Sequence, residues 1–254
     1  MPYANNGGVR IYYEAEGVGP PLLLHHGWTG YGGSWRMMGQ VDTFVPHCRV
    51  IVMDARGHGR SDKPHEGAAY TMDKRAADVC AVLDAEGIDA VNYYGYSMGG
   101  RTGFGLARYR QDRLQTLIIG GASPRSPLRY DQEQMRRLIV SLRTNGLRDL
   151  LALFSDRSEV FKKRFMLNDA EALAAEREGL LMWDGMDPST ITVPTLIFVG
   201  EADGVLGPAQ DAAAKIPNVE FHVLPDLNHM QANMSPEGPR LALDFLRKHG
   251  ILPK

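Results

Sequence analysis

The octet from residue 93 to residue 100, Tyr-Tyr-Gly-Tyr-Ser-Met-Gly-Gly, constrains the fold more than any other part of the chain. It follows an apolar stretch and precedes a segment compatible with a helix. It therefore predicts a tight turn from a strand into a helix, where Gly95 and Gly99 leave room for close packing. Such a turn lifts the Ser97 hydroxyl out of the sheet at the N-terminus of the helix, whose first amides are free to bind an anion. Ser97 is the candidate nucleophile; taken alone, the motif could also be a glycine-rich turn without chemistry.

Short apolar segments alternate with segments of helical spacing, which predicts an α/β fold with a mostly parallel sheet and helices on both faces. Continuously apolar strands are typical of a sheet that is buried on both sides. We expect an antiparallel edge strand over Val9–Glu16, and further strands over Leu22–His25, Val50–Asp54, Val91–Tyr94, Leu114–Gly120, Thr195–Val199 and Val219–Leu224. We expect core helices over Ser34–Phe44, Asp73–Glu86 (ended by Gly87), Met98–Tyr109 and Pro236–His249.

The alternation stops between residues 123 and 187, where no strand is predicted. Four segments rich in Leu, Met, Phe and Arg instead have helical character: Asp131–Thr144, Leu147–Phe154, Glu159–Met166 and Asp169–Met182. We expect residues 1–122 and 188–254 to form the core domain and residues 123–187 to be an inserted helical cap. Such a cap would lie over the carboxyl ends of the strands, where open α/β sheets place their sites; the alternative is that the block packs as additional core.

Five motifs occur in the same order, with the same kind of spacing, as in a known family. They are His26-Gly27-Trp28, the turn Asp54-x-Arg56-Gly57-x-Gly59-x-Ser61, the turn around Ser97, Gly200-x-x-Asp203 and Asn228-His229. On these motifs the chain resembles the α/β-hydrolase fold superfamily, in its serine esterase, lactonase and perhydrolase-like branch with a helical cap. The resemblance implies a sheet of about eight strands, and it implies architectural roles for His26 and for the turn from residue 54 to residue 62.

In this family the acid and the base follow the nucleophile in the chain. A serine hydroxyl needs an imidazole to take its proton and a carboxylate to orient that imidazole. Three histidines follow Ser97. His222 falls inside a predicted strand and His249 near the end of the chain, whereas His229 falls between the last strand and the last helix. We therefore expect His229 to be the catalytic base.

The catalytic acid should follow the strand that begins at Thr195. Both Glu201 and Asp203 lie there, and Asp203 is favoured because it is further into the loop. Asp226 is a third candidate. The expected catalytic residues are therefore Ser97, Asp203 and His229.

The negative charge that develops on a substrate oxygen needs at least two amide donors. We expect them to be the backbone N–H groups of Trp28 and Met98. The side chains of Trp28, Met98 and Met230 are candidates for the wall of the substrate pocket. No cluster of histidines or cysteines has the spacing of metal ligands, so neither a metal nor a cofactor is expected.

The bulk composition excludes several classes of partner. With a net charge of −2, the chain of 254 residues gives no electrostatic reason to bind nucleic acid or an anionic membrane. It has only Cys48 and Cys80, no apolar segment of about 20 residues and no predicted signal peptide, so we expect a cytoplasmic protein without a membrane span. The oligomeric state cannot be predicted.

We expect a hydrolase that cleaves a small or medium, mostly apolar ester or lactone through an acyl-enzyme. Relatives that are haloalkane dehalogenases or soluble epoxide hydrolases carry an aspartate where this chain has Ser97, which disfavours those reactions. Thr29 replaces the proline of many perhydrolases. The alternatives are a C–C bond hydrolase or perhydrolase that uses the same three residues, and a ligand-binding receptor with little turnover.

Overall fold

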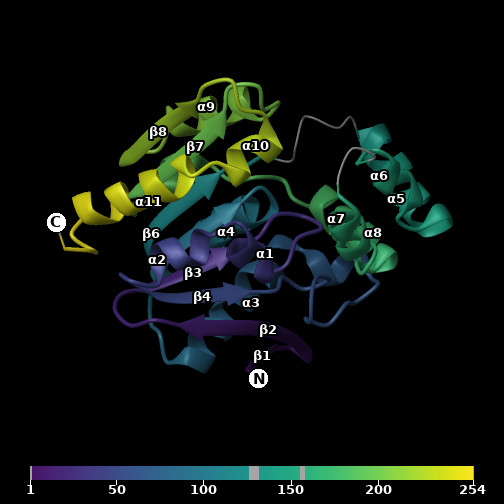
Figure 1. The fold of residues 1–254 in the computed structure, drawn as a ribbon, viewed down its shortest axis with the longest axis horizontal. Helices are drawn as coiled ribbons and strands as arrows, with labels where there is room; N and C mark the ends of the chain where they lie inside the picture. Colours follow the sequence, from purple (N-terminus) through teal and green to yellow (C-terminus); the bar gives the residue numbers. More distant parts are fainter. Residues whose placement is uncertain (1, 126–131, 155–157, 254) are drawn as a thin grey trace.

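The computed structural model describes residues 2–125, 132–154 and 158–253. Within them, eight strands form one sheet in the order β1-β2-β4-β3-β5-β6-β7-β8 (Figure 1). β1 and β2 are antiparallel to their neighbours, and the remaining strands are parallel. This confirms the predicted fold class. The strands are β1 (Tyr3–Asn6), β2 (Val9–Glu16), β3 (Pro21–His25), β4 (Arg49–Met53), β5 (Val91–Tyr96), β6 (Leu114–Gly120), β7 (Thr195–Gly200) and β8 (Val219–Leu224).

Helices cover both faces of this sheet, because successive side chains of a strand point to opposite sides. On one face, Leu23 and Ile51 belong to the apolar core beneath α3 (Met72–Glu86), α4 (Met98–Arg110) and α9 (Leu206–Ala213). On the other face, Leu22 and Leu24 belong to the core beneath α1 (Gly33–Met37), α2 (Gln40–Phe44) and α11 (Glu237–Lys248). The central strands β3 to β7 are buried from both sides, as their continuous apolar sequences predict, whereas β1 and β8 at the two edges are partly exposed.

Four helices follow β6 and precede β7: α5 (Gln132–Asn145), α6 (Arg148–Ala152), α7 (Glu159–Phe165) and α8 (Ala170–Leu181). We call these helices the helical segment. It has its own apolar cluster, which includes Leu142, Phe165 and Leu173. In Figure 1 it lies beyond the carboxyl ends of β3 and β4. Residues 126–131 and 155–157 of the predicted cap lie outside the described residues.

Several local predictions were wrong. Val9–Glu16 is not an edge strand, because β1 pairs with it through a hairpin in which Gly7 and Gly8 have φ of 59° and 90°. The helix expected from residue 34 to residue 44 is divided into α1 and α2 at Gly39, which has φ of 70°. α9 and α10 (His229–Met234) were not predicted, although both are helices in the structure.

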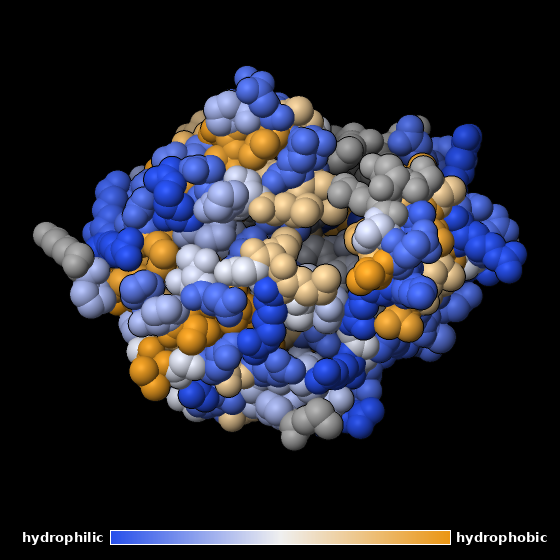
Figure 2. Space-filling view, viewed as in Figure 1, coloured by the Kyte–Doolittle hydropathy of each residue, from blue (hydrophilic) through white to orange (hydrophobic). Residues whose placement is uncertain are grey.

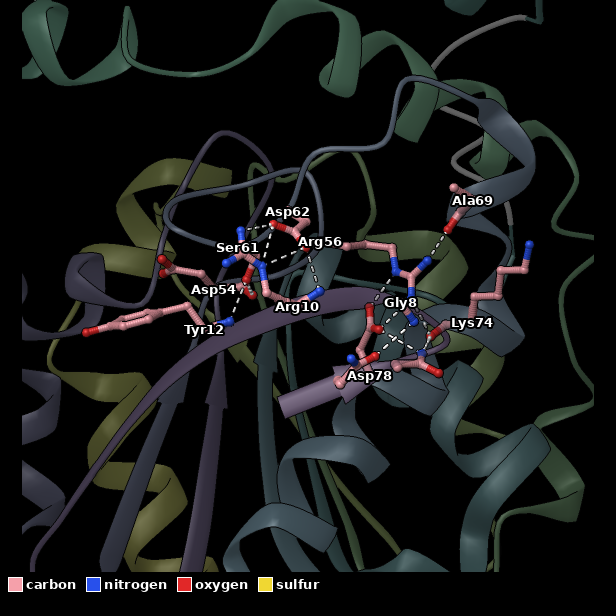
Figure 3. A network of polar contacts seen from close by, with 12 residues as sticks. Gly8, Arg10, Tyr12, Asp54, Arg56, Ser61, Asp62, Ala69, Lys74 and Asp78 are labelled. Carbon is pink, nitrogen blue, oxygen red and sulfur yellow. Dashed lines mark hydrogen bonds and ion pairs between the residues drawn. The ribbon is translucent and has the colours of Figure 1, made fainter. Parts of the chain in front are cut away.

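The turn from residue 54 to residue 62 holds the loop that follows β3. The Gly32 N–H donates a hydrogen bond of 2.6 Å to Asp54 Oδ1, and the Ala55 N–H donates one of 3.0 Å to His26 Nε2. Both ends of the loop are therefore tied to this turn. The turn itself is anchored to β2, as Figure 3 shows.

An ion pair between Arg56 and Asp78 joins the same turn to α3 (Figure 3). The side chains are 4% and 3% exposed, and Arg56 Nε donates a hydrogen bond of 2.5 Å to Asp78 Oδ2. Burial raises the pKa of Asp78 against the opposing effect of Arg56, so this carboxyl is strongly desolvated. By contrast, the neighbouring pair between Arg10 and Asp62 is at the surface, with the Arg10 side chain 63% exposed.

Replacing Arg56 by Met should destabilise the protein by about 3–5 kcal/mol, because it leaves the Asp78 carboxyl buried without its partner. Urea denaturation followed by circular dichroism measures the change. Arg10→Met is the matched control: its ion pair is exposed to solvent, so the unfolding midpoint should change little. Equal losses of stability in the two variants would contradict the assignment of the buried pair as the anchor.

Candidate active site

The turn between β5 and α4 is as tight as its glycines predict. Ser97 has φ of 54°, a strained conformation for a residue with a side chain. A Cβ atom at Gly95 would lie 2.4 Å from the backbone of Gly99, and one at Gly99 would lie 2.1 Å from the carbonyl oxygen of His25. The Ser97 N–H donates a hydrogen bond of 2.8 Å to the carbonyl of Gly120 in β6, which holds the strained residue in place.

The structure brings together the three side chains that the sequence singled out. Ser97 Oγ lies 2.9 Å from Nε2 of His229, and Nδ1 of His229 lies 2.5 Å from Oδ2 of Asp203. If Asp203 accepts the proton on Nδ1, Nε2 has a free lone pair directed at the serine hydroxyl. The Asp203 side chain is fully buried and that of His229 is 25% exposed. The imidazole therefore has one side in the protein and the other open to a ligand.

The loop after β7 holds the Asp203 carboxylate in this orientation. The Asp203 N–H donates to the carbonyl of Gly200 at 3.0 Å, and the Val205 N–H donates to Asp203 Oδ1 at 3.1 Å. The two alternative acids contact one another instead, since Glu201 Oε2 accepts a hydrogen bond of 3.0 Å from the Asp226 N–H at the exposed surface.

His229 is the first residue of α10. Asn228 caps this helix by accepting hydrogen bonds from the Met230 and Gln231 amides, and the Gln231 side chain returns a contact to the Asn228 amide. This is a capping box, and the Asn-x-x-Gln spacing that produces it was present in the sequence but was not used to predict the helix.

The other two histidines that follow Ser97 in the chain lie near Glu220. Nε2 of His222 is 4.0 Å from the Glu220 carboxylate, and Nε2 of His249 is 3.4 Å from it.

Tyr96 is a further residue that contacts the imidazole, and the sequence did not single it out. Its hydroxyl donates a hydrogen bond of 2.6 Å to the backbone oxygen of His229, and the two ring centroids are 5.3 Å apart. Burial and the charge of Asp203 raise the pKa of Tyr96 well above its usual value, so the hydroxyl stays protonated and can donate. The contact joins the end of β5 to the start of α10, two positions 133 residues apart in the chain, which no local pattern could reveal.

The loop after β3 is packed against the start of α4. The Gly99 N–H donates to the carbonyl of His26 at 3.1 Å. Since His26 Nε2 accepts from Ala55, its Nδ1 carries the proton that is donated to the Gly27 carbonyl at 2.7 Å. Burial lowers the pKa of His26, which agrees with a neutral, architectural imidazole.

The two backbone amides predicted to bind an oxyanion, those of Trp28 and Met98, lie in the two segments that this packing joins. Neither the Trp28 N–H nor the Met98 N–H donates a hydrogen bond within residues 2–125, 132–154 and 158–253. The residue after Trp28, Thr29, has φ of 65°, so the loop is strained next to one of these donors. Backbone donors that converge beside a nucleophile can bind a developing oxyanion.

The predicted pocket residues differ in exposure. Trp28 and Met230 are partly exposed, whereas Met98 is 1% exposed and belongs to the protein interior. Figure 2 shows the surface hollowed between the core and the helical segment. A cavity of about 550 Å³ is lined by residues that include the loop 29–33, Arg164 of α7, and Leu167 and Asn168 between α7 and α8. The described residues that line this cavity do not include Ser97 or His229.

The described part of the chain contains no group of three or more His, Cys, Asp and Glu side chains arranged to hold a metal ion. No helix in that part has the length and apolar character that crossing a membrane requires.

Comparisons with known proteins identify the family to which this fold belongs. Residues 20–153 match the model of the α/β hydrolase fold family. The chain is 28% identical to the 2-hydroxy-6-oxo-6-(2'-aminophenyl)hexa-2,4-dienoic acid hydrolase of Metapseudomonas resinovorans, over 99% of this chain and 92% of that protein. It is 29% identical to a non-heme haloperoxidase of Rhodococcus erythropolis, over 90% and 93% of the two chains. The enol-lactonase of Burkholderia xenovorans LB400 superposes with a TM-score of 0.86 at 26% identity, covering 96% and 99% of the two chains. The protein belongs to the α/β-hydrolase fold family.

Proposed function

We propose that this protein is a serine hydrolase that cleaves carboxylic esters or lactones through an acyl-enzyme. The observation that carries the proposal is the continuous contact from Asp203 through His229 to Ser97, with Ser97 Oγ 2.9 Å from His229 Nε2. Proton transfer requires a base within about 2.6–3.2 Å of the proton donor, and this distance meets that requirement. The similarity to a lactonase structure supports the substrate class.

In the proposed reaction, Ser97 Oγ attacks the carbonyl carbon of the substrate while His229 Nε2 takes the hydroxyl proton. The resulting tetrahedral intermediate collapses when His229 returns this proton to the leaving alcohol oxygen, and the acyl group remains on Ser97. Water then attacks the acyl-enzyme, with His229 as the base that deprotonates it, and the acid product leaves. Asp203 holds the imidazole in one tautomer and stabilises its positive charge.

The amides of Trp28 and Met98 are the proposed donors to the oxygen of the tetrahedral intermediate. Each such donor contributes roughly 3 kcal/mol of transition-state stabilisation. We further propose that residues 123–187 act as a cap over this site and that Trp28 and Met230 border the acyl pocket; the Met98 side chain, predicted to do the same, is buried in the protein interior. A small or medium, mostly apolar acyl group fits such a pocket.

The relatives also support two other reactions with the same three residues. A C–C bond hydrolase is similar to this chain over 99% of its length, and a haloperoxidase over 90%. A panel of nitrophenyl esters of increasing acyl length, several lactones and one dienoic ketone distinguishes ester and lactone hydrolysis from C–C bond cleavage. Ester or lactone turnover that exceeds cleavage of the ketone supports the main proposal.

Ser97→Ala should reduce hydrolysis of the best ester in that panel by at least about a thousandfold, because no other group supplies the nucleophile. Release of nitrophenol measures the rate, and circular dichroism checks that the variant is folded. A fluorophosphonate probe should label the parent protein at Ser97 and leave the variant unlabelled. The role of Ser97 is refuted if the folded variant hydrolyses the ester near the parent rate, whereas labelling without any turnover would favour a receptor.

Asp203→Asn should lower kcat by about 10⁴-fold, since the amide favours the wrong tautomer of His229. Glu201→Gln is the matched control, because Glu201 follows the same strand and contacts Asp226 instead of the imidazole. Its kcat should change by less than about twofold. A large loss in the Glu201 variant together with a small loss in the Asp203 variant would reverse the assignment.

A further inference from the structure

The indole of Trp28 is held between the core and the helical segment. The guanidinium carbon of Arg177, from α8, lies 4.1 Å from the centroid of the Trp28 ring, within the range of a cation–π contact. The indole also packs against the apolar cluster of the helical segment, which includes Leu173 and Phe165. Its Nε1 atom is buried and has no hydrogen-bond partner among the described residues, so packing and stacking hold the ring.

Arg177 is itself fixed by a buried ionic cluster. Arg177 Nε lies 2.7 Å from Glu176 Oε2, and Arg75 Nη1 of α3 lies 2.6 Å from Glu176 Oε1. The three side chains are between 1% and 4% exposed. Burial alone would raise the pKa of Glu176, but the charges of Arg177 and Arg75 lower it to about 2, so the group is a carboxylate at neutral pH. The cluster therefore connects the core helix α3 to the stacked guanidinium.

The neighbours of Trp28 in its loop are Gly27 and the strained Thr29, and the Gly30 N–H donates to the Gly27 carbonyl at 3.1 Å. The Asn168 side chain also holds this loop, by donating a hydrogen bond of 3.2 Å to the Thr29 carbonyl. Trp28 has the one large side chain among residues 27–30, so its indole is the apolar anchor of this short loop. We propose that Arg177 is a positioning residue: by clamping the Trp28 indole, it fixes the adjacent backbone amide where the oxyanion forms. This inference rests on the proposed function, and it makes the helical segment part of the catalytic apparatus.

The proposal predicts an effect on the chemical step and not on binding alone. An oxyanion donor acts mainly in the transition state, so its displacement lowers kcat more than it changes KM. A displacement of about 1 Å can cost as much as a hundredfold in rate. A purely structural Arg177 would instead lower the melting temperature and leave the kcat of the folded protein unchanged.

The test compares Arg177→Met, Arg143→Met, Trp28→Ala and the double variant Trp28→Ala/Arg177→Met, each with the best ester of the panel. Fluorophosphonate labelling counts the active sites, so that kcat refers to folded enzyme. Arg143 is the matched control: it lies in α5, pairs with Glu178 of α8 at 2.8 Å, and is 39% exposed. Its replacement makes the same chemical change in the same segment without contact to Trp28.

We expect Arg177→Met to lower kcat about tenfold or more with less than a threefold change in KM, and Arg143→Met to change kcat less than twofold. The double variant should have a kcat within about twofold of that of Trp28→Ala, because Arg177 acts through the indole. If Arg177→Met fails to fold, Arg177→Lys replaces it; the lysine keeps the charge but loses the planar stacking group, and kcat should fall at least threefold.

Three results would overturn the inference: a kcat of the Arg177 variant within twofold of the parent, equal losses in the Arg177 and Arg143 variants, or additive losses in the double variant. These outcomes leave the proposed function intact as long as the probe labels Ser97 of the parent. Absence of both labelling and turnover in the parent would remove the proposed function, and this inference with it.

Discussion

The close approach of backbones around Ser97 is the constraint on which the rest of the structure depends. Strand β5, helix α4 and the loop after β3 meet so tightly that a methyl group at Gly95 or Gly99 would overlap backbone atoms. Strain at Ser97 is maintained because β6 and the loop hold the turn from two sides. Met98 directly follows Ser97, and Trp28 lies two residues after His26, whose carbonyl accepts from the Gly99 N–H. The same packing therefore joins the segment of the candidate nucleophile to the loop that carries the other candidate oxyanion donor.

Three further loops at the same edge of the sheet complete the site, and each is held by its own contacts. Asp203 is held by the turn after β7, and His229 by the capped start of α10 and by Tyr96. The loop after β3 is tied to the turn of residues 54–62, which α3 anchors through Arg56 and Asp78. The rigid parallel sheet thus supplies the common frame, and hydrogen bonds inside each loop set the orientation of a single side chain.

The sequence was sufficient for features with local signals and insufficient for those that depend on distant contacts. Continuous apolar strands and helical spacing predicted the order of the core elements, and the glycines of the turn singled out Ser97. Asp203 and His229 were singled out by their positions after predicted strands together with the order of acid and base in the family that the chain resembles. The strand β1 is only four residues long, and α10 is six, so their periodicity is too brief to recognise. Tyr96 and Arg177 were missed because a hydroxyl in a strand and an arginine in a helix carry no signal of their partners. Their partners, His229 and Trp28, are brought to them only by the fold.

The proposed function depends on one chemical event, the transfer of an acyl group to the Ser97 oxygen. Intact-protein mass spectrometry after rapid acid quench of the protein with a slowly hydrolysed nitrophenyl ester observes this event directly. We predict a mass increase equal to one acyl group, which peptide mapping places on Ser97. Turnover of the ester without any acyl adduct on Ser97, or with the adduct on another residue, would contradict the account.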